Sequence, residues 1–179
     1  MSLRRFFKIY KFLILLILIT VPVFGGSDIP KKNILITAFG PYGGMDKNPS
    51  EMILNLMKER ENLSKKLNFT FQLLRVVYGD VDNFINETDF SKYDLIVMMG
   101  LNPDSKKIKI ETVGINLSDD TKDIDSIPRP GTIINRGPVR IRMQEKYIKK
   151  IVKYVKRKKQ PFVFSEFDGN YVCNYLNHS

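Results

Sequence analysis

The chain holds a single cysteine, and its sequence context is typical of a reactive thiol. Cys173 lies in the run 169–174 (GNYVCN), where a glycine-containing turn leads into an expected helix. The dipole and the free backbone N–H groups of a helix start favour a thiolate, which is the form that attacks a carbonyl carbon. A lone cysteine can equally be a small buried apolar residue, so the position alone leaves both interpretations open.

Two further side chains could take part in thiol chemistry. Glu111 lies in the mostly apolar run 108–117, where a carboxylate could orient a base or hold a substrate amine, or could face water on an edge strand. His178 is the only histidine and lies five residues after Cys173. Five residues of helix turn by about 140°, so the two side chains leave the helix on different faces. A histidine this near the end of the sequence is typically a mobile surface group.

A glycine-rich loop, residues 38–44 (AFGPYGG), follows the first apolar run. It has neither the G-x-G-x-x-G pattern nor the G-K-[ST] ending of the common phosphate-binding loops. Phe39 and Tyr42 give it aromatic surface that suits a small apolar or amide ligand, although a plain tight turn fits the residues as well. The chain has one cysteine and one histidine, which are too few ligands for a typical His/Cys metal site, so we expect no metal and no cofactor.

The elements that must position these residues alternate along the chain. Apolar runs predict strands at 33–37, 69–78, 94–99, 108–117 and 161–165. Helices are expected from Asn48, at 81–87, at 140–159 and from 170, with a loop at 119–135. This alternation predicts an α/β three-layer sandwich with a largely parallel mixed sheet.

The first helix has the clearest start signal. Asn48 is the expected N-cap, Pro49 the first helical residue and Glu51 the reciprocal capping partner. The spacing of its apolar residues predicts a buried stripe formed by Ile53, Leu54 and Met57.

The N-terminus predicts export. Four basic residues precede the uncharged run 12–24 (FLILLILITVPVF), and small residues follow it. The run is shorter than the ~20 residues that span a bilayer. Residues 1–25 are therefore expected to be a signal peptide or an uncleaved signal anchor, which makes the protein periplasmic, secreted or membrane-anchored through this segment. The domain itself is expected over 33–179.

The chain carries a net charge of +10, and residues 142–159 hold nine basic residues and one acid. Such a basic helix could bind nucleic acid or anionic lipid. Its apolar positions, among them Ile141, Ile148 and Val155, keep helical spacing, which favours a solvated outer face instead. No stacking aromatic residues alternate with the charges in the way that nucleic-acid sites require, so no nucleic-acid partner is expected.

Three motifs in register resemble the pyroglutamyl-peptidase I family, the pyrrolidone-carboxylate peptidases. The family loop G-F-x-P-F-G-G and its N-P-S sequence are matched by residues 38–44 and 48–50. Its E-x-x-A-I-N-L strand is matched by 111–117, and its nucleophile motif G-x-[FY]-[VL]-C-N by 169–174. The family segment I-P-D is matched by 127–129, with Arg129 in place of the aspartate.

The resemblance implies a thiol omega-peptidase that removes an N-terminal pyroglutamate from peptides, either as a monomer or as a homo-oligomer. Cys173 would be the nucleophile, Glu111 would orient a histidine base, and backbone N–H groups at the Cys173 helix start would stabilise the oxyanion. The pyroglutamate pocket would be lined by Phe39, Tyr42, Ile127, Tyr171 and Val172.

The chain also departs from the family pattern. The family histidine lies in an F-I-H-x-P run on a strand after the nucleophile helix, and no such run is present here. The resemblance therefore implies a C-terminally truncated member whose fold lacks the last strand and helix. Two interpretations follow, a peptidase with doubtful turnover and a catalytically inactive homologue that binds pyroglutamyl peptides. The family is usually cytoplasmic, whereas the N-terminus predicts export.

Overall fold

The computed structural model describes residues 30–60, 65–134, 136–158, 161–166 and 171–178, without the side chains of Asn177 and His178. Lys31–Ser179 forms one compact unit. The predicted export segment, residues 1–25, lies outside the described residues. Among the helices in the described ranges, none is both long and apolar enough to cross a membrane.

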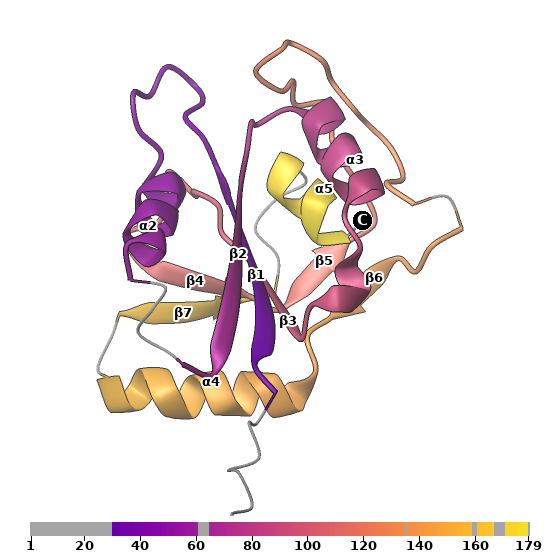
Figure 1. Ribbon diagram of the computed structural model, residues 1–179. Helices are drawn as coiled ribbons and strands as arrows, with labels where there is room; N and C mark the ends of the chain where they lie inside the picture. Colours follow the sequence, from indigo (N-terminus) through magenta and orange to yellow (C-terminus); the bar gives the residue numbers. More distant parts are fainter. Residues whose placement is uncertain (1–29, 61–64, 135, 159–160, 167–170, 179) are drawn as a thin grey trace, which may run out of the picture. The chain divides into compact units, whose positions relative to one another are not determined.

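The first half of the domain is built on a parallel three-stranded sheet in the order β2-β1-β3 (Figure 1). Its strands are β1 (Lys32–Phe39), β2 (Leu67–Leu74) and β3 (Leu95–Met98). The predicted strand at 69–78 thus ends earlier, because Tyr78 begins the helix α3 (Tyr78–Glu87). A short 3-10 helix, η2 (Phe90–Lys92), leads into β3.

Both faces of β1 are covered, which explains its uninterrupted apolar sequence. Ile34, Ile36 and Ala38 pack with Leu54 of α2 (Pro49–Lys58) on one face. Phe39 points to a second cluster on the other face, formed with residues of α3 and of α5 (Val172–His178). A strand buried on both faces reads as a continuous apolar run rather than as an alternating one.

The predicted stripe of α2 is only partly correct. Leu54 is fully buried and Met57 packs against the same cluster, but Ile53 is 47% exposed. The apolar run 94–99 is typical of a buried strand, but Leu95 is 49% exposed and β3 forms an edge of its sheet. An apolar run therefore identified the strand correctly and its burial incorrectly.

The second half of the domain forms two short strand pairs. β4 (Ile108–Glu111) pairs in parallel with β7 (Phe162–Ser165), and β5 (Val113–Ile115) pairs antiparallel with β6 (Arg140–Arg142). The expected single strand at 108–117 is therefore wrong. Thr112 marks the change of partner, because its N–H donates to the Ser165 carbonyl and its carbonyl accepts from the Met143 N–H.

The basic helix α4 (Glu145–Lys158) begins five residues later than the predicted 140–159, since Arg140–Arg142 pairs as β6. The loop at 119–135 contains no strand within its described residues, in agreement with its prolines and glycine. The predicted mixed α/β class with largely parallel strand pairing is confirmed, with the described strands divided among three sheets.

The N-cap of α2 holds the glycine loop in place. Asn48 caps the helix by accepting from the Ser50 N–H, and its side-chain amide donates to the Gly40 carbonyl at 2.8 Å. The Ser50 hydroxyl also donates to the Phe39 carbonyl and accepts from the Phe39 N–H. Asn48 and Pro49 thus stand where the sequence predicted, while Ser50, rather than the expected Glu51, completes the cap.

Asn174 fixes α5 against the edge of β5. Its amide nitrogen donates to the carbonyls of Ile115 (2.8 Å) and Leu117 (3.0 Å), and its oxygen accepts from the Ile115 N–H (3.0 Å). The Asn174 side chain is buried, and its three hydrogen bonds satisfy backbone groups of Ile115 and Leu117. The residue beside Cys173 in the sequence is therefore the one that positions its helix.

We expect Asn174→Ala to destabilise the domain by about 2–4 kcal/mol, because the buried amide and its three hydrogen bonds to backbone groups are lost. Urea unfolding followed by circular dichroism measures this change. Asn55→Ala, on an exposed position of α2, is the matched control and should shift the free energy of unfolding by less than ~0.5 kcal/mol. Equal effects of the two substitutions would show that Asn174 does not hold α5.

Candidate active site

Cys173 occupies the second position of α5 and is partly buried. Its side chain lies directly against Gly100, which is two residues after the end of β3. A methyl group added at Gly100 would come within 2.8 Å of the Cys173 sulfur, which is closer than packed atoms allow. The absence of a side chain at position 100 therefore makes room for the thiol.

The electrostatic surroundings of Cys173 oppose ionisation. Burial, followed by the negative charge of Glu111, raises the pKa of the Cys173 thiol to about 12. The expectation that the helix start favours a thiolate is therefore wrong for the protein as described. The backbone hydrogen bond at Cys173 lowers the pKa of the thiol, but it does not offset burial together with the nearby carboxylate.

Glu111 ends β4 and is exposed. Its effect on the thiol pKa shows that its charge lies near Cys173, although the two residues are 62 positions apart in the sequence. Pairing of β4 with β7 and packing of α5 on β5 bring the carboxylate and the thiol into the same region.

Four of the five residues predicted to line a pocket gather beside Cys173. Phe39 and Val172 are buried in one apolar cluster, and Tyr42, Tyr171 and Cys173 pack against it. The ring centroids of Tyr42 and Tyr171 lie 6.4 Å apart at an angle of 50°. Phe39 and Val172 lie beneath the surface, so only the two tyrosines remain accessible to a ligand.

Hydrogen bonds fix both tyrosine rings. The Tyr42 hydroxyl donates to the Leu101 carbonyl at 3.2 Å, and the Tyr171 hydroxyl donates to the Lys122 carbonyl at 3.1 Å. Burial raises the pKa of Tyr171 to about 12 and raises that of Tyr42 above its ordinary value. Both phenols therefore stay neutral at physiological pH.

A shallow depression of about 510 Å³ opens next to these rings. It lies between the glycine loop and the segment 122–124, and Cys173 is not among its lining residues. The lining residues are Pro41, Tyr42, Gly43, Gly44, Met45, Lys122, Asp123, Ile124 and Tyr171.

Ile127 is not part of the cluster around Cys173. Its side chain is 56% exposed, and its N–H donates to the Asp123 carboxylate at 2.9 Å. Four of the five residues therefore lie in one cluster with Cys173, while the fifth lies on the neighbouring loop. That they line a pyroglutamate pocket stays a prediction.

Sequence reasoning missed Asp123, which organises that loop. Its buried carboxylate accepts from the backbone N–H groups of Tyr78, Asp125 and Ile127. The first of these bonds caps the start of α3, where the N-cap residue Val77 has no side chain that could do so. No local pattern reveals this cap, because Asp123 lies 45 positions from the helix that it caps.

Arg129 replaces the aspartate expected from the family segment I-P-D. Its side chain contacts two helices, α3 and α5. Its guanidinium forms an ion pair with Asp82 of α3 and donates to the Tyr175 hydroxyl of α5 at 2.7 Å. The Tyr175 hydroxyl in turn donates to Asp82 at 2.8 Å, and the guanidinium lies 5.2 Å from the Tyr175 ring centroid. The cation thus ties the loop to the helix that carries Cys173.

Within the described ranges, no three His, Cys, Asp or Glu side chains come together in a group that could hold a metal ion. The side chain of His178 lies outside the described residues, so the predicted separation between His178 and Cys173 stays a prediction.

Comparison with known proteins identifies the family. The sequence profile described as pyroglutamyl peptidase matches residues 32–179. The chain belongs to the pyroglutamyl peptidase family. Among its relatives, the pyrrolidone-carboxylate peptidase of Bacillus cytotoxicus is 30% identical over 149 residues, which cover 81% of this chain and 67% of that protein. The pyrrolidone-carboxylate peptidase of Thermococcus onnurineus is 33% identical over 146 residues, covering 79% and 70%.

Solved structures of the family agree with the fold. The pyrrolidone carboxyl peptidase of Fervidobacterium islandicum aligns with a TM-score of 0.74 at 28% identity, covering 83% of this chain and 71% of that one. Pyroglutamyl peptidase I of Bacillus amyloliquefaciens aligns with a TM-score of 0.71 at 25% identity, covering 82% and 70%. The α/β architecture of this chain is therefore that of a pyroglutamyl peptidase.

We expect Gly100→Ala to displace the Cys173 side chain and to cost about 1–3 kcal/mol of stability, because the new methyl group overlaps the sulfur. Thermal unfolding measures the stability, and the alkylation rate of the single cysteine reports its surroundings. Gly79→Ala is the matched control, since a methyl group there meets no atom within 4 Å. A Gly100→Ala protein with unchanged stability and alkylation rate would contradict the close contact.

Proposed function

We propose that this chain acts on peptides that begin with pyroglutamate and that the Cys173 thiol is its nucleophile. The observation that carries the proposal is the place of the only cysteine, beside the Tyr42–Tyr171 pair and within reach of the Glu111 charge. The family assignment supports the substrate class.

In the proposed reaction, the Cys173 sulfur forms a bond to the carbonyl carbon that joins pyroglutamate to the next residue. The amide C–N bond then breaks, and the departing amine takes up the proton that the thiol gave up. Water hydrolyses the resulting thioester, which releases pyroglutamate and restores the thiol. Backbone N–H groups at the start of α5 would stabilise the negative oxygen of each tetrahedral intermediate.

Pyroglutamate is small, flat and uncharged, and the neutral tyrosine rings suit such a group. We place it between Tyr42 and Tyr171, above the buried side chains of Phe39 and Val172, with Ile127 contributing from the adjoining loop. The depression bounded by the glycine loop and residues 122–124 would then receive the part of the peptide that follows pyroglutamate.

This mechanism requires a group that accepts the proton of the Cys173 thiol. A thiol with a pKa of about 12 needs a base, and Glu111 by itself disfavours the thiolate. The family resemblance implies a histidine that Glu111 orients, while the only histidine of this chain is His178. A thiol that acts without a base usually turns over about 10³-fold or more slowly than one that has it. The raised pKa therefore favours a second candidate function, the binding of pyroglutamyl peptides without appreciable turnover.

For the first candidate, the purified chain should release a chromogenic amine from a pyroglutamyl amide, and Cys173→Ser should abolish that release. Calorimetric titration with a pyroglutamyl peptide tests the second candidate function. If that function is correct, the peptide binds but is not hydrolysed. Equal hydrolysis by the wild type and Cys173→Ser would remove the thiol from the mechanism. Absence of both hydrolysis and binding would contradict both candidates.

Glu111→Gln should change thiol reactivity and hydrolysis in opposite directions. Removal of the carboxylate charge lowers the pKa of Cys173, so the thiolate fraction at pH 8 rises and iodoacetamide alkylation accelerates roughly threefold. Hydrolysis should fall, because the group that orients the base is lost. Glu87→Gln removes an equal charge from the exposed end of α3 and should alter neither rate. Slower alkylation of Glu111→Gln would disprove the assigned electrostatic role.

A further inference from the structure

The helix α4 has two chemically distinct faces. With 100° between successive residues, every cationic side chain except that of Lys158 projects from one side of the helix, and the apolar side chains project from the other. The cationic face consists of Lys146, Lys149, Lys150, Lys153, Lys156 and Arg157. The apolar face consists of Tyr147, Ile148, Ile151, Val152, Tyr154 and Val155.

Few carboxylates neutralise the cationic face. Lys149 pairs with Glu145 at 2.9 Å, and among the described residues this is the single ion pair of the face. All six cations of the face are exposed. The positive charge of the face is therefore available to an anionic partner outside the domain.

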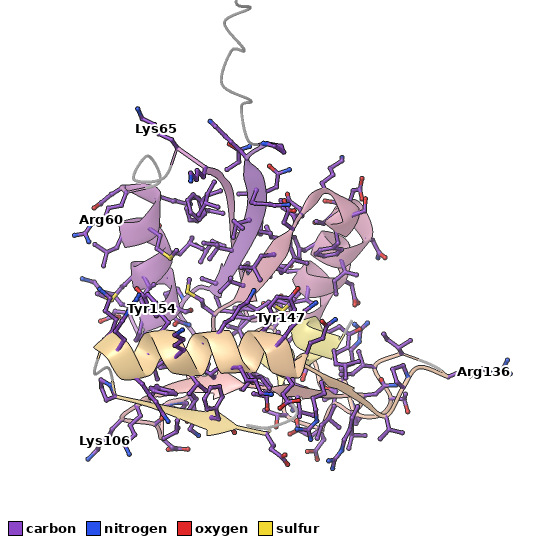
Figure 2. All side chains as sticks on the ribbon, turned by 90° about the horizontal axis from the view of Figure 1, so that it is seen from below. Arg60, Lys65, Lys106, Arg136, Tyr147 and Tyr154 are labelled. Atoms are coloured by element: carbon purple, nitrogen blue, oxygen red, sulfur yellow. The ribbon has the colours of Figure 1, made fainter. Side chains whose placement is uncertain are left out.

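Two tyrosines remain in solvent at one border of the apolar face. Tyr147 is 44% exposed and Tyr154 is 56% exposed, whereas the aliphatic residues of the face are half-buried. Lys146 lies 4.9 Å from the Tyr147 ring centroid, and Arg157 lies 5.6 Å from that of Tyr154. Figure 2 shows both tyrosines on α4, whereas the labelled cations Arg60, Lys65, Lys106 and Arg136 come from other parts of the chain.

We propose that α4 binds the surface of an anionic lipid bilayer. Its lysines would pair with lipid phosphates and carboxylates, and Tyr147 and Tyr154 would lie at the level of the headgroups. Clusters of four to eight basic residues on an amphipathic helix bind anionic membranes, and tyrosine concentrates at the membrane interface. The aromatic rings are covered by cations of the same helix rather than arranged as a platform for bases, so lipid suits α4 better than nucleic acid.

The N-terminal sequence adds a second membrane-directed feature. Residues 1–25 carry four basic residues and the apolar run 12–24. A single weak anchor binds membranes reversibly, and a polybasic surface added to it makes the attachment stable. This combination fits a protein that works at a lipid surface.

The first test measures partitioning of the full chain onto sedimented vesicles. Wild type should bind vesicles of 30% phosphatidylserine in phosphatidylcholine about 100-fold better than Lys146→Gln/Lys150→Gln/Lys153→Gln/Lys156→Gln, because four cations are removed. Lys58→Gln/Arg60→Gln/Lys65→Gln/Lys106→Gln removes equal charge outside α4 and should retain most of the binding. All three chains carry the same N-terminal segment, so differences between them report α4.

The second test does not depend on the folding of the neutralised variant. The chain contains no tryptophan, so Tyr154→Trp introduces one fluorescent reporter on α4. Its emission should shift to the blue with anionic vesicles and return when 0.5 M salt screens the contact. Tyr93→Trp, located after η2, should show no shift.

Several results would overturn the proposal. These are equal binding to neutral and anionic vesicles, equal losses for the two quadruple variants, and an unshifted Tyr154→Trp emission. Stronger salt-sensitive binding to duplex DNA or RNA than to anionic vesicles would assign the face to nucleic acid instead. No salt-sensitive binding to any of these probes would leave α4 as a solvated outer face.

Discussion

The geometry around the thiol depends on the hydrogen bonds of Asn174. Two hydrogen bonds to Ile115 of β5 and one to Leu117 just after it hold α5 in place, and Cys173 is the residue immediately before Asn174. The same helix is held from its other side by the bonds that join Tyr175, Arg129 and Asp82. A short helix has little stability of its own, so tertiary contacts of this kind must fix its position.

Around this helix, the protein keeps an uncharged thiol next to a carboxylate. Burial and the Glu111 charge act in the same direction on the thiol, and Gly100 allows the sulfur to approach the backbone closely. The arrangement becomes favourable for attack only when a positive charge or a base enters between the sulfur and the carboxylate. The site therefore favours the neutral thiol in the absence of such a group, and its aromatic border is equally neutral.

Polar contacts to distant helices hold the loop at 119–135. Arg129 stands where the family segment has an aspartate, and its charge is balanced by Asp82 on α3. Asp123 of the same loop caps α3 from a distance of 45 positions in the sequence. Both contacts join the loop to helices, so ionic and polar interactions hold the loop in addition to the apolar packing of Tyr42, Tyr171 and Ile133.

The sequence by itself determined the family, the α/β class and the clustering of Phe39, Tyr42, Tyr171 and Val172 with Cys173. These features follow from local patterns, namely a buried apolar strand, a glycine loop, an N-cap at Asn48 and motifs with fixed spacing. The tertiary structure alone decided the protonation of Cys173, the partner change at Thr112 and the exposure of Leu95. Desolvation and strand pairing depend on which distant residues lie nearby, and no local window of sequence contains them.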